Sequence, residues 1–104
     1  MYSFVETPPF AVDADKLWTE DERLEFFLWL ASHPDAGDVI PGSGGCRKVR
    51  WSRPGMGKRG GVRVIYFVRM AEGEIWLLLV YAKSVRDNIP GRLLREIREE
   101  IERG

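Results

Sequence analysis

The sequence predicts a single α+β domain in which helices pack against one face of a small sheet. The length of 104 residues leaves room for one domain. The composition, 44% hydrophobic and 31% charged, is that of a globular chain with its own core. The segments follow the order strand, two helices, three strands and helix, which is typical of the α+β class.

The N-terminal third is predicted to form one strand and two helices. Residues 2–7 are extended and stop at two prolines, and residues 13–18 form a brief helix. Thr19 and Glu22 have the spacing of a capping box, so a second helix begins there and runs to about Ser32. We expect the two helices to pack on the sheet through their apolar residues.

The rest of the chain is predicted to form an antiparallel meander followed by a helix. Residues 34–45 are rich in turn residues and are expected to be a flexible lead-in, because no Lys-Ser or Lys-Thr follows their glycines as in a phosphate loop. Alternating and β-branched residues indicate three strands, at 46–51, 62–70 and 74–83. Periodic apolar residues indicate a final helix at 91–103. A basic glycine-rich loop, 52–61, and a tight turn at Glu72-Gly73 connect the strands.

Residue usage excludes several kinds of protein. The single cysteine and single histidine cannot form a disulfide framework or a Cys/His zinc site, and they favour a reducing compartment. We expect Cys46 to be incidental and His33 to end a helix. The N-terminus lacks the pattern of a signal peptide, and the longest apolar run, 75–82, is too short to cross a bilayer. A soluble cytoplasmic protein that makes no membrane contact is expected.

Charge is unevenly distributed although the net charge is zero. Residues 1–45 carry a net charge of −7, residues 46–69 carry eight cations and no acid, and residues 70–104 carry −1. Cations at this density repel one another, and phosphate is the favoured counter-ion because arginine binds it through two parallel hydrogen bonds. A solvated basic face and pairing with the acidic N-terminal third are the alternatives.

Side-chain alternation along the strands predicts which cations act together. Lys48 and Arg50 share one face of their strand, whereas Arg47 lies on the other face with Val49. Arg63 shares a face with Arg69 on the next strand.

Such residues can cleave RNA without a metal ion. The ribose 2′-oxygen loses a proton, attacks the neighbouring phosphorus and expels a 5′-oxygen, which requires a base, an acid and stabilisation of a charged phosphorane. Arginine supplies the stabilisation, and a lysine whose pKa is lowered by nearby cations can serve as the base. Tyr66 or Tyr81 can stack on a base or donate a proton.

The stretch from Gly44 to Lys83 resembles the RelE/ParE superfamily of type II toxin–antitoxin toxins, and the HigB/RelE-like branch most closely. The most specific pieces are GDVIPGSGGCRKVRW and GKRGGVRVIY, and with FVETPPF at the start the resemblance covers nearly the whole chain. It implies the small microbial RNase-like (RelE-like) fold, with a curved antiparallel sheet, two N-terminal helices packed on one face and a C-terminal helix.

The resemblance also implies a function and partners. The expected protein is a toxin that acts as an mRNA endoribonuclease (an mRNA interferase) on the ribosome, needs no cofactor or metal, and inhibits translation. A cognate antitoxin, usually of the helix-turn-helix type in this branch, would hold it inactive. Promoter DNA would be bound only through that antitoxin.

The family's basic positions map onto particular residues of this chain. Lys48 and Arg50 in CRKVRW, Arg63 in GVRVIY and Lys83 in YAK match them. Some family members have an arginine directly after that lysine and a tyrosine a few residues later. Here Ser84 and, roughly, Ile89-Pro90 stand there, so the identity of the general acid stays open.

The possible proton donors are Lys83, Tyr81, Lys58, the ribosome and solvent. These considerations also give two sets of candidate residues. The candidate catalytic residues are Lys48, Arg50, Arg63, Lys83 and Tyr81, and the candidate RNA-binding residues are Arg47, Arg53, Lys58, Arg59 and Arg69.

Two other functions remain open at this point. A ParE-like toxin that poisons DNA gyrase would share the fold and need no RNA chemistry, although the dense cations argue against it. A non-catalytic RNA- or ribosome-binding module would use the same cations for docking alone.

Overall fold

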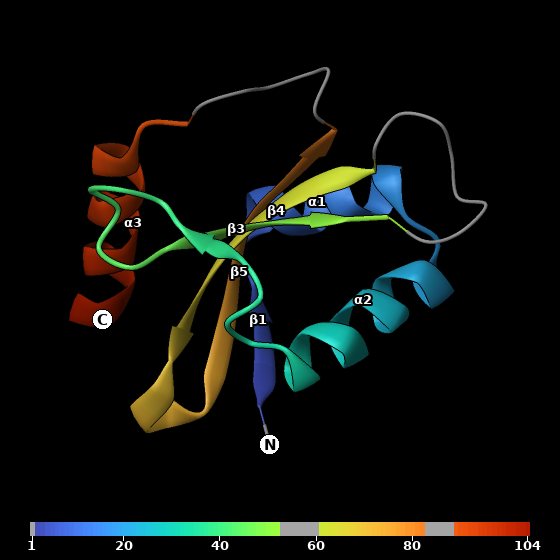
Figure 1. The fold of residues 1–104 in the computed structure, drawn as a ribbon, viewed down its shortest axis with the longest axis horizontal. Helices are drawn as coiled ribbons and strands as arrows, with labels where there is room; N and C mark the ends of the chain where they lie inside the picture. The colour runs from blue at the N-terminus through green and yellow to red at the C-terminus, as the bar shows by residue number, and fades with distance from the viewer. Residues whose placement is uncertain (1, 53–60, 83–88) are drawn as a thin grey trace.

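A five-stranded sheet lies between helices in the computed structural model, which describes residues 2–52, 61–82 and 89–104 (Figure 1). The α+β class predicted from the sequence is confirmed. None of the helices in these ranges combines the length and apolarity needed to cross a bilayer. The main elements are β1 (Ser3–Glu6), α1 (Pro8–Leu17), α2 (Glu20–Ser32), β2 (Asp38–Val39), β3 (Arg47–Trp51), β4 (Val62–Arg69), β5 (Glu74–Ala82) and α3 (Gly91–Arg103).

The strand order is β1-β5-β4-β3-β2, and it confirms the predicted meander. β3, β4 and β5 pair antiparallel with one another, and their ends fall within one residue of the predicted bounds. The expectation of a wholly antiparallel sheet was wrong, because β1 runs parallel to β5. A parallel neighbour needs a long crossover, and the helices and the rest of the meander supply that length. The turn-rich lead-in also contains a strand, since β2 pairs with β3.

Helix α1 begins earlier than the sequence predicted. The two prolines that end β1 occupy the first turn of α1, where a missing N–H removes no helical hydrogen bond. Thr7 caps this turn because its hydroxyl accepts a hydrogen bond from the Phe10 N–H. Helix α2 begins as predicted, at a capping box in which Thr19 and Glu22 each accept a hydrogen bond from the other's backbone N–H.

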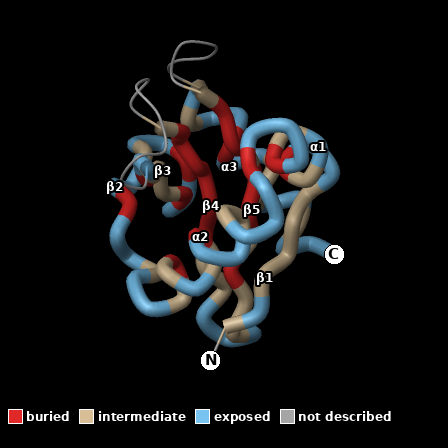
Figure 2. The backbone as a smooth tube through the Cα atoms, turned by 90° about the vertical axis from the view of Figure 1, so that its right-hand side faces the viewer, coloured by how far each residue is buried: buried red, intermediate tan, exposed pale blue. Residues whose placement is uncertain are grey.

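The sheet carries an apolar core on each face. Helices α1 and α2 cover one face, where Phe10 and Phe26 pack with β-strand residues such as Val64. Helix α3 covers the other, where Leu94 packs with Phe67. In Figure 1, α3 and α2 lie on opposite sides of the sheet, and in Figure 2 the buried stretches follow β4 and β5 between them.

The prediction that the helices pack against one face of the sheet therefore holds for α1 and α2 and is wrong for α3. The reason is visible in the sequence, because β5 is apolar on both faces and each face must therefore pack against another element. An amphipathic C-terminal helix is the element available for the second side.

A bulge between β4 and β5 sets which way the end of β5 faces. Ile65 pairs with Leu79 but Tyr66 pairs with Leu77, so Leu78 is an extra residue and resets the alternation. Tyr81 consequently joins the core cluster on the α3 side.

Glycine allows α3 to approach the loop between β2 and β3. A Cβ on Gly91 would lie 2.1 Å from the backbone oxygen of Pro41. Further along the helix, an Arg98 Nη donates to the Gly44 carbonyl oxygen at 2.8 Å, and the Arg98 guanidinium lies 4.6 Å from the centre of the Phe67 ring. The loop, helix and sheet are thus joined on this side.

Replacing Gly91 with alanine tests this close approach. In an unconstrained helix Gly→Ala is stabilising, but here the added methyl meets backbone, so we expect a loss of about 1–3 kcal/mol in the free energy of unfolding. Urea unfolding measures it, with Glu96→Ala, an exposed change on the same helix, as the control. A Gly91→Ala protein more stable than the wild type would contradict the proposed packing.

Candidate functional site

Three polar side chains from three strands form one row across the sheet. Arg50 of β3 pairs with Arg63 of β4, and Arg63 pairs with Tyr81 of β5. Directly opposed residues on antiparallel strands point to the same face and lie close together. Lys48, two residues before Arg50, faces the same way. We call Arg50, Arg63 and Tyr81, together with the adjacent Lys48, the cationic row, and it lies on the α3 side of the sheet.

A cavity of about 410 Å³ opens beside the cationic row. Two members of the row, Lys48 and Tyr81, contribute to its wall. The remaining lining comes from β2 and the loop after it, from the centre of β4 and from the chain entering α3: Asp38, Val39, Ile40, Pro41, Ile65, Ile89 and Pro90.

The row places like charges against each other. Arg63 and Tyr81 are buried, with 9% and 7% of their surface exposed, whereas Lys48 is half-buried and Arg50 is exposed. Opposed like charges on neighbouring strands are destabilising. Within the described part of the chain, neither Lys48 nor Arg50 forms an ion pair. A bound anion would relieve this repulsion, and phosphate fits the geometry of arginine.

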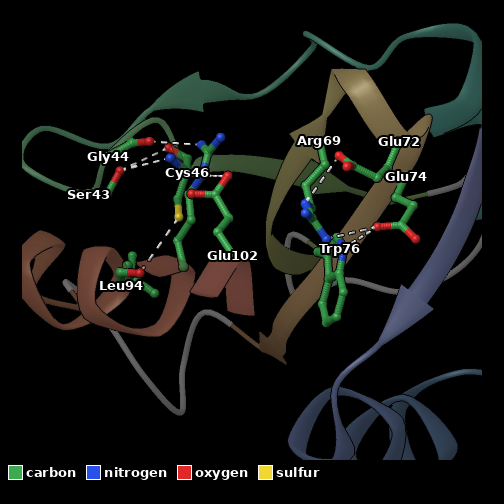
Figure 3. A network of polar contacts seen from close by, with 10 residues as sticks. Ser43, Gly44, Cys46, Arg69, Glu72, Glu74, Trp76, Leu94 and Glu102 are labelled. Carbon is green, nitrogen blue, oxygen red and sulfur yellow. Dashed lines mark hydrogen bonds and ion pairs between the residues drawn. The ribbon is translucent and has the colours of Figure 1, made fainter. Parts of the chain in front are cut away.

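Two of the predicted RNA-binding residues lie away from the row. Arg47 lies on the opposite face, and one of its Nη atoms donates to the Asp35 and Gly37 carbonyl oxygens at 3.2 and 2.6 Å. Arg69 forms ion pairs with Glu72 and Glu74, at 3.6 and 3.4 Å (Figure 3). It shares a face with Arg63 as predicted, but the two lie six positions apart along β4, which is roughly 20 Å.

The other predicted site residues fall outside the described ranges. Among the candidate catalytic residues this applies to Lys83. Among the candidate RNA-binding residues it applies to Arg53, Lys58 and Arg59, and Ser84, the departure from the family pattern, also falls there.

Tyr66 lies on the face opposite the cationic row and is fully buried in the core beneath α1 and α2. Its hydroxyl accepts from the Gly37 N–H at 3.0 Å and donates to the Pro34 carbonyl oxygen at 2.9 Å. Burial raises the pKa of this phenol, outweighing the Gly37 hydrogen bond, which lowers it. Tyr66 therefore anchors the chain that leads into β2, and base stacking by this residue would need its ring to leave the core.

Removing the Tyr66 hydroxyl tests this anchoring role. Tyr66→Phe leaves the buried Gly37 N–H without its acceptor, so we expect a loss of about 1–3 kcal/mol in the free energy of unfolding. Tyr2→Phe is the matched control, because the Tyr2 hydroxyl makes only a long, exposed contact of 3.7 Å to the Met70 sulfur. Equal urea midpoints for the two variants would show that the Tyr66 hydrogen bonds add nothing.

Asp38 is a candidate site residue that the sequence pattern does not reveal. It pairs with Lys48 across β2 and β3, so it faces the same side as the cationic row, and it lines the cavity. Gly37 makes this pairing possible, since a Cβ there would lie 2.9 Å from the Lys48 backbone oxygen. A two-residue strand has no periodicity, and the Gly-Asp dipeptide resembles a turn, so the available signal pointed elsewhere.

Cys46 is a structural residue on the α3 side. It is fully buried, its N–H donates to the Ser43 hydroxyl at 3.0 Å, and its thiol lies 4.0 Å from the Leu94 carbonyl oxygen (Figure 3). Burial raises the pKa of the thiol, more than the neighbouring Arg98 charge lowers it. A buried thiol that resists ionisation is a poor nucleophile.

The raised pKa of Cys46 predicts a stability loss at high pH. The unfolded chain releases the thiol proton near the ordinary value of 9.0, before the folded protein does. The contribution of this thiol is thus complete below about pH 9 and falls as the pH rises toward the folded pKa. We expect the stability difference between wild type and Cys46→Ala to shrink above pH 9 in urea titrations. A difference independent of pH would contradict this.

The site rests on its own geometry, since no protein-family model matches the chain. It combines two opposed arginines with a lysine and a buried phenol, and the lysine and the phenol line one cavity. Such a set can bind a phosphate, stabilise additional negative charge on it and exchange protons with the groups around it.

Proposed function

We propose that this protein is the toxin of a type II toxin–antitoxin system and cleaves mRNA on the ribosome as an endoribonuclease. The observation that carries the proposal is the cationic row, in which Arg50, Arg63 and Tyr81 are directly opposed across three strands. The α+β element order and the motifs CRKVRW and GVRVIY support a RelE-like fold in the RelE/ParE superfamily, nearest the HigB/RelE-like branch.

The row supplies each part of a metal-independent transesterification. Arg50 and Arg63 bind the non-bridging oxygens of the scissile phosphate and stabilise the phosphorane, where negative charge increases. Lys48 acts as the general base for the 2′-hydroxyl, whose oxygen then attacks phosphorus. The bond to the 5′-oxygen breaks and Tyr81 gives that oxygen a proton, so the products are a 2′,3′-cyclic phosphate and a 5′-hydroxyl.

The proposed partners follow from the same reading. Ribosome and mRNA supply the substrate, and the eight cations between residues 46 and 69 favour docking on RNA. A cognate antitoxin, acidic or shape-matched to the site, would cover or distort the cationic row. If it is of the helix-turn-helix type, the complex would bind promoter DNA through the antitoxin.

Replacement of Arg50 tests the catalytic role of the row. Arg50 is exposed and has no ion pair among the described residues, so Arg50→Gln should fold normally. Loss of one donor to the transition state costs about 100-fold or more in rate, and we expect that loss in cleavage of mRNA on programmed ribosomes. Lys16→Gln, which removes an exposed cation from α1, is the control and should cleave like the wild type.

Primer extension after induced expression gives the corresponding test in cells. Wild type should arrest growth with cleaved messages, and Arg63→Ala should be harmless. The proposal is wrong if purified wild-type protein leaves mRNA intact on programmed ribosomes. Damaged DNA with intact mRNA would select gyrase poisoning, and salt-sensitive ribosome binding without cleavage would select a non-catalytic module.

A further inference from the structure

The cavity beside the cationic row has a mainly apolar lining with a few polar and charged groups. Lys48 and Tyr81 are shared with the row, and six of its nine lining residues are apolar. Asp38 is the single carboxylate among the lining residues that the structure describes. A phosphate placed beside Asp38 would be repelled by it, whereas the arginines of the row attract one. The cavity therefore suits a part of the substrate that carries no charge.

A nucleobase has the required properties. Its flat faces bury well against isoleucine, proline and tyrosine side chains, and RNA-binding proteins read unstacked bases through the Watson–Crick edge. A volume of about 410 Å³ lies within the range of small-ligand pockets. The cavity adjoins the row through Lys48 and Tyr81, so a nucleotide with its phosphate on the row has its base within reach of the cavity.

The carboxylate discriminates between bases because it can only accept hydrogen bonds. Guanine offers two adjacent donors, N1–H and N2–H, which match the two oxygens of one carboxylate. Adenine and cytosine offer one donor beside an acceptor, and uracil offers one donor between two acceptors. We propose that Asp38 makes this cavity a guanine-selective base pocket, an inference that rests on the proposed function for its RNA substrate.

The contacts that hold the backbone around Asp38 support this role. Two side chains from the opposite face hold the segment before it. The Arg47 guanidinium donates to the Asp35 and Gly37 carbonyl oxygens, and the Tyr66 hydroxyl accepts from the Gly37 N–H. β2 then fixes Asp38 opposite Lys48. A carboxylate whose backbone is held in place before the ligand arrives has less freedom to lose on binding, which favours selectivity.

Binding of mononucleotides to the full chain tests the pocket without requiring cleavage. We expect guanosine 3′-monophosphate to bind at least about fivefold more tightly than the adenosine, cytidine and uridine 3′-monophosphates. NMR titration should place the largest amide shifts of the guanosine complex at Asp38 and Val39. Equal affinity for the four nucleotides, or no binding of any of them, would overturn the assignment.

A pair of matched variants isolates the carboxylate. Asp38→Asn puts an amide donor against a guanine N–H, so the preference should disappear. Asp35→Asn, three residues earlier and at the wall of a different cavity, should keep it. Because Asp38 is exposed, both variants should melt like the wild type. If Asp38→Asn retains the guanine preference, Asp38 is not the selecting residue.

Cleavage of messages that differ at one nucleotide separates this inference from the proposed function. Selective cleavage beside guanine that Asp38→Asn makes unselective supports both. Cleavage with no base preference in the wild type rejects the role of Asp38 and leaves the ribonuclease function standing. Selective guanosine binding without cleavage supports the pocket and rejects the ribonuclease function.

Discussion

The register between β3, β4 and β5 is the constraint on which the site depends. Val49, Val64 and Val80 lie opposite one another in the core beneath α1 and α2. Burial of such a row is strongly favourable, and a slip of one residue would turn it out to the other face. The next row along the strands is Arg50, Arg63 and Tyr81 on the opposite face. Apolar packing therefore fixes the spacing of charges that would otherwise separate.

Helix α3 defines how much of that second face stays open. Its apolar residues pack with Phe67 and Leu78, and Arg98 ties it to the loop between β2 and β3. The chain just before it, at Ile89 and Pro90, stands at the wall of the cavity. The helix thus covers the apolar part of the face and borders the polar part. Gly91 has no room for a side chain because the Pro41 backbone oxygen would lie 2.1 Å from its Cβ.

Sequence periodicity predicted most of the elements and part of the site. Alternation alone placed Lys48 and Arg50 together and Arg47 apart, and the capping box located the start of α2. The parallel partner of β1, the side of the sheet taken by α3 and the pairing of β2 depend on contacts between distant residues. The bulge at Leu78 also decides the direction of Tyr81, and no alternation rule reveals where an extra residue is inserted. Asp38 was missed for the same reason, because its position depends on a partner ten residues away.

The hydrogen-bond and ion-pair partners of the arginines divide the basic segment, residues 46–69, into two kinds of cation. Arg47 and Arg50 are three residues apart on one strand, yet Arg47 donates to two backbone carbonyls, while Arg50 has no ion pair among the described residues. A guanidinium occupied by carbonyl oxygens has fewer donors left for a phosphate, and removing it would loosen the segment that carries Asp38. Charge density along the chain therefore overstates the number of cations that the candidate site can use. Arg50, which the fold sets directly opposite Arg63, is exposed and has no ion pair among the described residues, so an anion bound there would relieve the repulsion between the two arginines.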